Sequence, residues 1–404
     1  MTAQRRPRRL LGGALIVALL LGVAAGCGDD GGDTDDASDT TEASEEMSAD
    51  VDPALEEAVA TTYADLVFDS YDDAVSGAVD MQTAIDTFVA APTDEPLDAA
   101  RQAWLDARDL YGPTEAFRFY DGPIDNPDDG PEGQINAWPM DEAYVDYVVD
   151  DPEAGIINDV EGYPEITADV LVSANEEGGE TNISTGWHAI EFLLWGQDQS
   201  EDGPGDRPVT DYTDSPTAER RATYLQELTT LLISDLESVR DEWDPESGAY
   251  REDFLSDPHE AISKMMRGIG ALSSGELAGE RIAVAWETKD QEDEHSCFSD
   301  NTDADVRNNA AGIELVYLAG GAEDSLSALV ASVSPELDQQ IRDQLDETTA
   351  IIETYDAPFD QMILGDDEAP GRVALIDTVE SLQAQGDLIA LAATELGHEI
   401  SLAI

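Results

Sequence analysis

Residues 53–90 read PALEEAVATTYADLVFDSYDDAVSGAVDMQTAIDTFVA, and this stretch decides the class of fold. Its large apolar side chains recur every three or four residues, as at Leu55, Val59, Tyr63 and Leu66. A repeat of that length places the side chains on one face of a helix. We therefore predict a long helix here, with an apolar face that packs against other helices.

The same repeat continues through most of the chain, and the alternating patterns typical of strands are nearly absent. Further helices are predicted over residues 97–110, 183–195, 218–243, 258–285, 306–318, 335–355 and 372–403. Two of them begin at the stretches SPTAERR and SPEL, in which serine caps the helix and proline occupies its first turn. These patterns predict an all-α protein of two packed helical bundles, over residues 51–205 and 206–404.

A long irregular segment near residues 111–150 interrupts the helices. Proline and glycine are frequent in it, yet it also contains aromatic residues such as Phe117, Tyr120 and Trp138. The aromatic side chains indicate that the segment is packed, and ordered connections of this length often line a site. The polar stretch DEHSCFSDNTDADVRNN at 293–309 is a second place of this kind.

The N-terminal residues resemble an export signal. MTAQRRPRRL contains four arginines and no acid, and an apolar run follows up to the small residues before Cys27. This order is typical of a signal peptide over residues 1–26. The sequence AAGC is similar to a lipoprotein box, so we expect Cys27 to be lipidated; an ordinary signal peptide is the alternative. The pair Arg8-Arg9 leaves Sec and twin-arginine export both open.

Residues 27–50 follow as an acidic stretch of aspartate, glutamate, glycine and small polar residues, without a single base. A segment of this composition cannot bury enough apolar surface to fold. We predict a disordered tether that holds the folded part away from a membrane.

The charge balance is strongly acidic. The chain has 91 acids against 19 lysines and arginines, for a net charge of −72. A nucleic-acid partner is excluded, because phosphate binding requires a basic face. Adaptation to a salty medium is the preferred explanation of the acid, and a surface that collects cations is the alternative. With Cys27 lipidated, Cys297 has no partner for an intrachain disulfide.

The stretch GWHAIE at 186–191 places a histidine and a glutamate inside an apolar run. On a helix, His188 and Glu191 are three residues apart and share a face. An imidazole nitrogen and a carboxylate oxygen at this spacing can bind one metal ion, and they suit iron, zinc or copper better than calcium. Gly186 is useful where another group approaches the backbone closely. The alternative is a buried His–Glu hydrogen bond without a metal.

The other histidine motifs do not form a standard zinc-protease site. HEAIS at 259–263 and HEISL at 398–402 lack the second histidine of the His-Glu-x-x-His pattern. We interpret His259 as part of a helix N-terminus and His398 as an edge residue of the core.

Five stretches together carry a resemblance to a known family. In chain order they are YGPTEAFRF, GPIDNPDDGPEGQINAWPMDEAYVDYV, TGWHAIEFLLWGQD, SCFSDNT and VRNNAAGIELVYL. They are similar to the imelysin family, also classed as M75 peptidases and as iron-regulated envelope proteins, and the resemblance covers residues 53–404. It implies two bundles that arose by internal duplication, with the motif near their interface. It also implies an exported, often lipid-anchored protein of iron acquisition, related to the periplasmic component of ferrous-iron uptake systems.

The resemblance also strengthens the metal interpretation of His188 and Glu191. We expect carboxylates from the 115–141 or 299–303 segments to complete the ligand set, with Glu115 and Asp300 as the candidates. Further motif residues with roles in or around the site are Gly186, Arg118, Asp125, Asp141, Ser299 and Asp303. For these, simpler alternatives remain: a salt bridge for Arg118, turns for the two aspartates near INAWP, and a helix cap for Ser299 or Asp300. Asp303 stands where family members usually carry a histidine.

Three functions are therefore in view. The preferred one is a lipid-anchored, extracytoplasmic protein that binds iron, or an iron-bearing ligand, for uptake. Its partners would be the membrane, through the lipid on Cys27, and an iron transporter. The second is a metallopeptidase with an open metal position that activates water, although no complete catalytic site is visible. The third is an interaction module in which the His–Glu pair is structural.

Overall fold

Helices provide almost all regular structure in residues 51–200 and 203–404, which are the residues that the computed structural model of the protein describes. Within these ranges no strand is present, and the extended backbone pairs only at a single bridge between Val148 and Asp151. The prediction of an all-α fold is confirmed. The predicted signal peptide, the lipidation site at Cys27 and the tether lie outside the described residues.

The helices share one pattern, in which long helices alternate with short turns of helix. In chain order they are α1 (Pro53–Ala90), α2 (Asp94–Tyr111), η1 (Gly112–Phe117), α3 (Glu132–Ile135), α4 (Glu142–Val145), α5 (Ala168–Ala174), α6 (Gly186–Trp195), η2 (Val209–Tyr212), α7 (Ala218–Glu242), α8 (Ala249–Ser256), α9 (Pro258–Ala271), η3 (Leu272–Ala283), α10 (Val284–Thr288), η4 (Gln291–Asp293), α11 (Thr302–Leu318), η5 (Ala319–Gly321), α12 (Leu326–Val333), α13 (Pro335–Ile352), α14 (Phe359–Met362) and α15 (Pro370–Glu395). Among them η3 is a π-helix that continues α9, and the other η elements are 3-10 turns.

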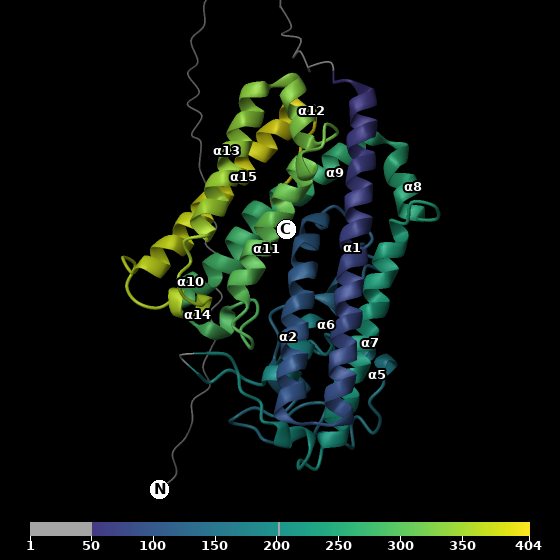
Figure 1. The fold of residues 1–404 in the computed structure, drawn as a ribbon, viewed down its shortest axis with the longest axis vertical. Helices are drawn as coiled ribbons and strands as arrows, with labels where there is room; N and C mark the ends of the chain where they lie inside the picture. The colour runs from purple at the N-terminus through teal and green to yellow at the C-terminus, as the bar shows by residue number, and fades with distance from the viewer. Residues whose placement is uncertain (1–50, 201–202) are drawn as a thin grey trace, which may run out of the picture. The chain divides into compact units, whose positions relative to one another are not determined.

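Two groups of helices pack side by side (Figure 1). In one group, α1 packs on α2 and α7, and α6 packs on α2 and α7. In the other, α15 packs on α9, η3 and α13, while α11 packs on η1 and α13. Helix α7 thus packs against α1, although it follows α1 by more than a hundred residues in the sequence. The predicted boundary near residue 205 and the internal duplication stay predictions.

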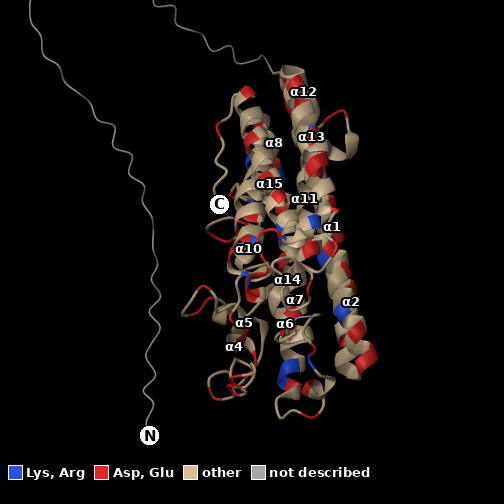
Figure 2. Cartoon of the chain, turned by 90° about the vertical axis from the view of Figure 1, so that its left-hand side faces the viewer, with Lys and Arg blue, Asp and Glu red and all other residues tan. Residues whose placement is uncertain are grey.

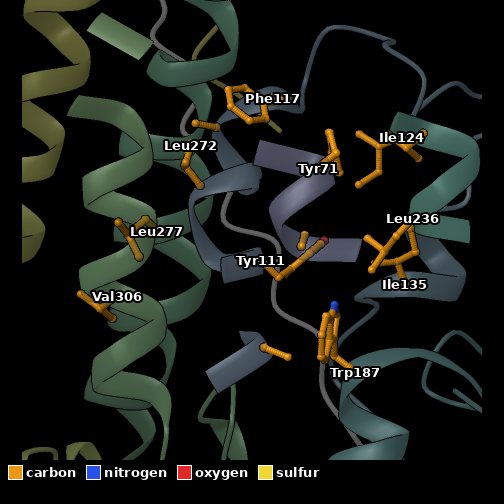
Figure 3. Packing of buried hydrophobic residues seen from close by; sticks show 14 of the residues in the cluster. Tyr71, Tyr111, Phe117, Ile124, Ile135, Trp187, Leu236, Leu272, Leu277 and Val306 are labelled. Carbon is orange, nitrogen blue, oxygen red and sulfur yellow. The ribbon is translucent and has the colours of Figure 1, made fainter. Parts of the chain in front are cut away.

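Helix α1 shows why the repeat in its sequence predicts its structure. Asp52 caps the helix by accepting a 3.0 Å hydrogen bond from the backbone N–H of Ala54, and Pro53 occupies the first turn. Of the predicted apolar positions, Val59 and Tyr63 are buried, whereas Leu55 and Leu66 are half-buried; Tyr71 on the same helix is also buried. Figure 3 shows Tyr71 in a core that also contains Tyr111 of α2, Trp187 of α6, Leu236 of α7, Leu272 and Leu277 of η3 and Val306 of α11. This core lies beside the site described below.

The last predicted helix ends earlier than expected. The prediction of a helix over 372–403 is wrong at its C-terminal end, because α15 stops at Glu395. Gly397 adopts φ +91°, a conformation that favours glycine, and the backbone N–H of His398 donates to the Ala393 carbonyl at 2.8 Å. The final residues therefore leave the helix axis just before His398.

Acidic residues occur along helices throughout the described part of the protein (Figure 2). None of the helices in the described residues is long and apolar enough to cross a membrane.

Candidate metal centre

The start of α6 brings the GWHAIE motif against the irregular segment. Gly186 adopts φ +84°, and a Cβ atom at this position would lie 2.5 Å from the carbonyl oxygen of Ile135. Only glycine permits this conformation together with so close an approach. Helix α6 is therefore held against α3, and all ten of its residues are buried.

His188 and Glu191 face each other on α6. Nδ1 of His188 lies 3.0 Å from Oε2 of Glu191. The other oxygen of Glu191, Oε1, accepts hydrogen bonds from the backbone N–H of Ser299 at 2.9 Å and from its hydroxyl at 2.7 Å. The buried Nε2 atom of His188 has no hydrogen-bond partner among the described residues. Both oxygens of Glu191 thus have hydrogen-bond partners, whereas His188 keeps one nitrogen for a ligand.

Burial controls the charge of this pair. It lowers the pKa of His188 well below its ordinary value, with the neighbouring His295 and Arg108 acting in the same direction. It raises the pKa of Glu191 to about 8, although the hydrogen bonds from Ser299 act against the shift. Both groups are therefore neutral at pH 7, and their contact is a hydrogen bond and not an ion pair. Neutral imidazole is also the form that binds metals.

A second histidine, His295, lies beside the pair. The centroid of its ring is 4.7 Å from that of His188, and the two ring planes meet at 74°. Its Nδ1 atom lies 2.8 Å from Oδ2 of Asp305. Asp305 also accepts hydrogen bonds from the Arg108 guanidinium at 3.0 Å and the Ser296 hydroxyl at 2.6 Å. Burial acts to raise the pKa of Asp305, but Arg108 and His295 outweigh it and hold that pKa well below its ordinary value.

The ionised carboxylate fixes the tautomer of His295. Burial, together with the charge of Arg281, lowers the pKa of His295 to about 4, so the ring is neutral at pH 7. Because a carboxylate only accepts hydrogen bonds, the proton of this neutral ring must lie on Nδ1, which faces Asp305. The lone pair is then on Nε2, as a metal ligand requires.

His295 is not among the site residues predicted from the sequence. It lies in the 293–309 stretch that is predicted to line a site, in which the predicted site residues are Ser299, Asp300 and Asp303. The stretch was the available signal, because it is polar, irregular and part of the family resemblance. Because His295 is far from the GWHAIE motif in the sequence, local spacing could not predict that the two lie in contact.

An acid-lined cavity of about 550 Å³ adjoins the histidines. His295 and Trp138 form part of its wall, and the Trp138 ring lies with its centroid 4.8 Å from that of His188. The charged residues that line the cavity are Glu132, Glu176, Glu180, Glu276, Glu280, Asp293, Arg118 and Arg281. Three of these, Glu276, Glu280 and Arg281, come from the π-helix η3, an element that often marks functional sites. Six acids against two bases make the cavity attractive to cations.

The structure places Glu115 in a network of arginines. Its carboxylate accepts hydrogen bonds from Arg118 at 2.7 Å, from Arg281 at 2.6 Å and from the Asn136 amide at 3.3 Å. Asn136 in turn accepts a 2.6 Å hydrogen bond from Arg108, which connects Glu115 to the His295 side of the site. Burial acts to raise the pKa of Glu115, but Arg118 and Arg281 outweigh it and hold that pKa well below its usual range. Arg118 makes the predicted salt bridge, and a ligand role for Glu115 stays a prediction.

The four predicted aspartates have separate surroundings. Burial and the nearby carboxylates of Asp360 and Asp198 raise the pKa of Asp300 to about 7. Asp303 pairs with Arg307 at 3.3 Å. Asp125 accepts hydrogen bonds from the backbone N–H groups of Phe119 and Gly122, and Asp141 caps α4 through the N–H of Ala143 at 3.0 Å. The last two thus have the contacts of turn and cap residues. No contact of these aspartates with His188 or Glu191 is found in the described structure.

Fold and site together define an all-α protein with a buried histidine centre beside an acid-lined cavity. The pattern that characterises the Imelysin family, Peptidase_M75, matches residues 67–389. The chain belongs to the imelysin family. The prediction drawn from the five sequence stretches is confirmed.

Individual relatives agree with this assignment. The chain is 28% identical over 339 residues to iron-regulated protein A of Synechococcus elongatus, covering 80% of this chain and 82% of that protein. Its fold is similar to a crystal structure described as an iron-regulated protein A precursor from Parabacteroides distasonis, with a TM-score of 0.68, 19% identity and coverage of 86% and 96%. It is also similar to an imelysin-like protein from Psychrobacter arcticum, with a TM-score of 0.64, 15% identity and coverage of 87% and 99%. At these identities the two structures bear on the fold alone.

Proposed function

We propose that this protein is a lipid-anchored, extracytoplasmic binding protein that takes up iron, or an iron-bearing ligand, as its cargo. Membership of the imelysin family and the relative named iron-regulated protein A support a role connected with iron. Transfer of the cargo to a membrane transporter completes the proposal. The lipid on Cys27 and the acidic tether would keep the protein at the membrane surface.

The observation that carries the proposal is the pair of carboxylate-held imidazoles. Nδ1 of His188 contacts Glu191, and Nδ1 of His295 contacts Asp305. Metal-binding histidines in proteins commonly donate one ring N–H to a carboxylate, which orients the ring and leaves the other nitrogen for the metal. The unpartnered Nε2 of His188 fits this arrangement once Glu191 loses its proton, a loss that metal binding would favour because it releases protons. Iron accepts imidazole nitrogen readily, as do zinc and copper.

In this arrangement Glu191 has a different role from the one expected from the sequence. Because its oxygens are engaged by His188 and Ser299, we propose that it orients His188 and does not bind the metal through the same contacts. We propose that carboxylates of the adjoining cavity move to complete the cargo's ligand set, and their summed charge would concentrate cations near the histidines.

Metal-binding measurements on the purified protein test this proposal. The wild type should bind iron with a Kd of about 1 µM or tighter, equivalent to about −8.2 kcal/mol. His188→Ala and His295→Ala should each weaken binding at this centre by at least the roughly 10–100-fold that loss of an outer partner costs. Asp303→Asn, which removes a half-buried carboxylate that pairs with Arg307, serves as the control. Equal iron stoichiometry and affinity in all four proteins would contradict the assignment of His188 and His295 as metal ligands.

A metallopeptidase is the alternative that the family's name suggests. Hydrolysis requires a metal-bound water and a free base beside it, whereas both oxygens of Glu191 are already engaged. We expect no proteolysis of unfolded substrates above a chelator-treated control. Chelator-sensitive proteolysis that disappears in both His188→Ala and Glu191→Ala would establish the peptidase instead. Absence of metal binding together with absence of proteolysis would favour the interaction module.

Two further properties belong to this proposal. Cys27→Ser should release the protein from the membrane fraction without unfolding it, because the tether separates the anchor from the folded part.

The excess of 91 acids over 19 bases is proposed to be an adaptation to salt. The melting temperature should then rise with sodium chloride, as screening reduces the repulsion between acids.

A further inference from the structure

A second cluster of metal-binding side chains lies where three helical elements begin or end. Glu56 is in the first turn of α1, His259 is in the first turn of α9, and His398 follows the end of α15. We call these three residues the end cluster. Their candidate ligand atoms all lie within 4.8 Å of one another. No such group of three or more is found elsewhere in the described residues.

The contacts within the end cluster are close. Nδ1 of His259 lies 2.9 Å from Oε1 of Glu56. The ring centroids of His259 and His398 are 4.1 Å apart, with an angle of 37° between the planes. In a tetrahedral site with metal–nitrogen bonds of about 2.0–2.1 Å, neighbouring ligand atoms lie about 3.3 Å apart. Side-chain rotations that move each ligand atom by about an ångström or less therefore suffice to bring the three groups to one ion.

Burial provides an independent indication of a ligand. Glu56 and His398 are each only 7% exposed. Nε2 of His398 is shielded from solvent and has no hydrogen-bond partner in the described part of the chain. A buried polar atom without a partner is unfavourable, and such atoms usually mark a missing water, ion or ligand. The side chain of His259, in contrast, is 55% exposed, so one side of the cluster is open to solvent.

The two histidines stand at the N-terminal end of α9, beside a single carboxyl group. A metal ion held by Glu56 would account for the two imidazoles gathered beside one carboxyl group and for the turn that brings His398 back to α9. That turn depends on Gly397, which adopts φ +91°.

We propose that the end cluster binds a divalent transition-metal ion of the zinc type. Two imidazoles and one carboxylate are a ligand set that suits Zn²⁺, with a fourth position left for water on the exposed side. The site is separate from the His188 centre and does not depend on the function proposed for it. By joining the beginnings of α1 and α9 to the C-terminal segment, the bound ion holds both ends of the folded part together.

The test is a Zn²⁺ titration of the purified protein followed by imidazole NMR. The chain has only four histidines, so each ring signal can be assigned by substitution. Zn²⁺ should shift the signals of His259 and His398, and equilibrium dialysis should count one more bound Zn²⁺ in the wild type than in His259→Ala. His259→Ala is suitable because an exposed side chain can be removed without unfolding the protein. Its Zn²⁺ affinity at this site should fall at least about 100-fold, the upper end of the loss for an outer partner.

A matched control separates a specific site from general attraction to an acidic surface. Glu399→Gln removes a charge from an exposed residue next to His398 and should leave the affinity within about twofold, as exposed changes usually do. Glu56→Gln should weaken binding as strongly as His259→Ala. The proposal is overturned if the wild type and His259→Ala bind the same amount of Zn²⁺ with equal affinity. It is also overturned if Glu399→Gln weakens binding as much as Glu56→Gln.

Discussion

The four histidines of the chain form two pairs that differ in their burial, in the angle between their rings and in their acidic partners. His188 and His295 lie in the interior, with ring planes at 74°, and each contacts its own carboxylate through Nδ1. His259 and His398 lie at the ends of helices, with planes at 37°, and share the single carboxylate of Glu56. One pair is fully buried, whereas the other is open on the His259 side.

The difference shows two ways in which a fold can prepare a metal site. At the interior pair, hydrogen bonds fix each ring before any ion arrives, and Arg108 fixes Asp305 while Ser299 fixes Glu191. A site of this kind is preorganised, and its occupancy depends on access through the wall that contains Trp138. At the end cluster, His398 is placed by a chain turn, and the ion itself completes the geometry. The interior pair should therefore depend on the fold, and the end cluster should contribute to the fold mainly when loaded.

The largest expected effect comes from breaking the interior network. Asp305→Asn removes the charge that pairs with Arg108 at 3.0 Å and with the His295 ring. Loss of one partner of a buried ion pair leaves an uncompensated charge and costs about 3–5 kcal/mol. The free energy of unfolding, measured in urea without metal, should fall by this amount. Asp303→Asn, which removes a half-buried charge paired with Arg307 two residues before Asp305, should change it by no more than about 1 kcal/mol. Equal effects of the two changes would show that the network does not stabilise the interior pair.

The protonation of Glu191 should have a smaller effect on the free energy of unfolding, and this effect should change gradually with pH. Its pKa is raised to about 8 in the folded state, from an ordinary value of 4.5. The folded protein therefore keeps a proton that the unfolded chain loses between these values. The contribution of this proton to stability is complete below pH 4.5 and is lost as the pH rises through about 8, at no more than about 1.4 kcal/mol per pH unit. Glu191→Gln cannot ionise, so its stability relative to the wild type should improve over this range.

The matched measurement uses metal-free protein in urea at several pH values, and the difference between the two proteins is plotted against pH. Comparing the difference removes the titration of the many other acids, which is common to both proteins. A difference that stays flat between pH 5 and 8 would contradict the raised pKa and the neutral state of the interior pair.

Local patterns predicted the helices well, because the information lies within a few residues. The repeat predicts α1 at Pro53–Ala90 as observed, and α7 within one residue of its end, although the residue before α7 is Thr217 and not the serine predicted as its cap. The end of α15 was mispredicted, since a helical repeat continues past Glu395 while the backbone turns at Gly397. Such a turn depends on the conformation of one residue and on what it packs against.

The site was predictable only where its residues are neighbours in the sequence. His188 and Glu191 could be paired by their spacing of three. The contact of Arg108 with Asp305 spans 197 residues, and that of His259 with Glu56 spans 203. Nothing in the local pattern of either stretch specifies its partner, so His295 was missed and His259 and His398 were interpreted as structural. Contacts of this kind follow from tertiary packing, which a single sequence does not reveal.

The smallest expected effect completes the comparison between the pairs. In metal-free protein, His259→Ala removes a side chain that is 55% exposed, together with its hydrogen bond to Glu56. A partly exposed contact of this type contributes little, so the free energy of unfolding should change by no more than about 0.5 kcal/mol. His295→Ala should cost several times more under the same conditions, because it removes a buried ring and leaves Asp305 without one of its donors. Saturating Zn²⁺ should then enlarge the deficit of His259→Ala relative to the wild type, since only the wild type gains the binding energy of the end cluster. A His259→Ala protein that is strongly destabilised without metal would show that the end cluster, like the interior pair, is a structural part of the fold.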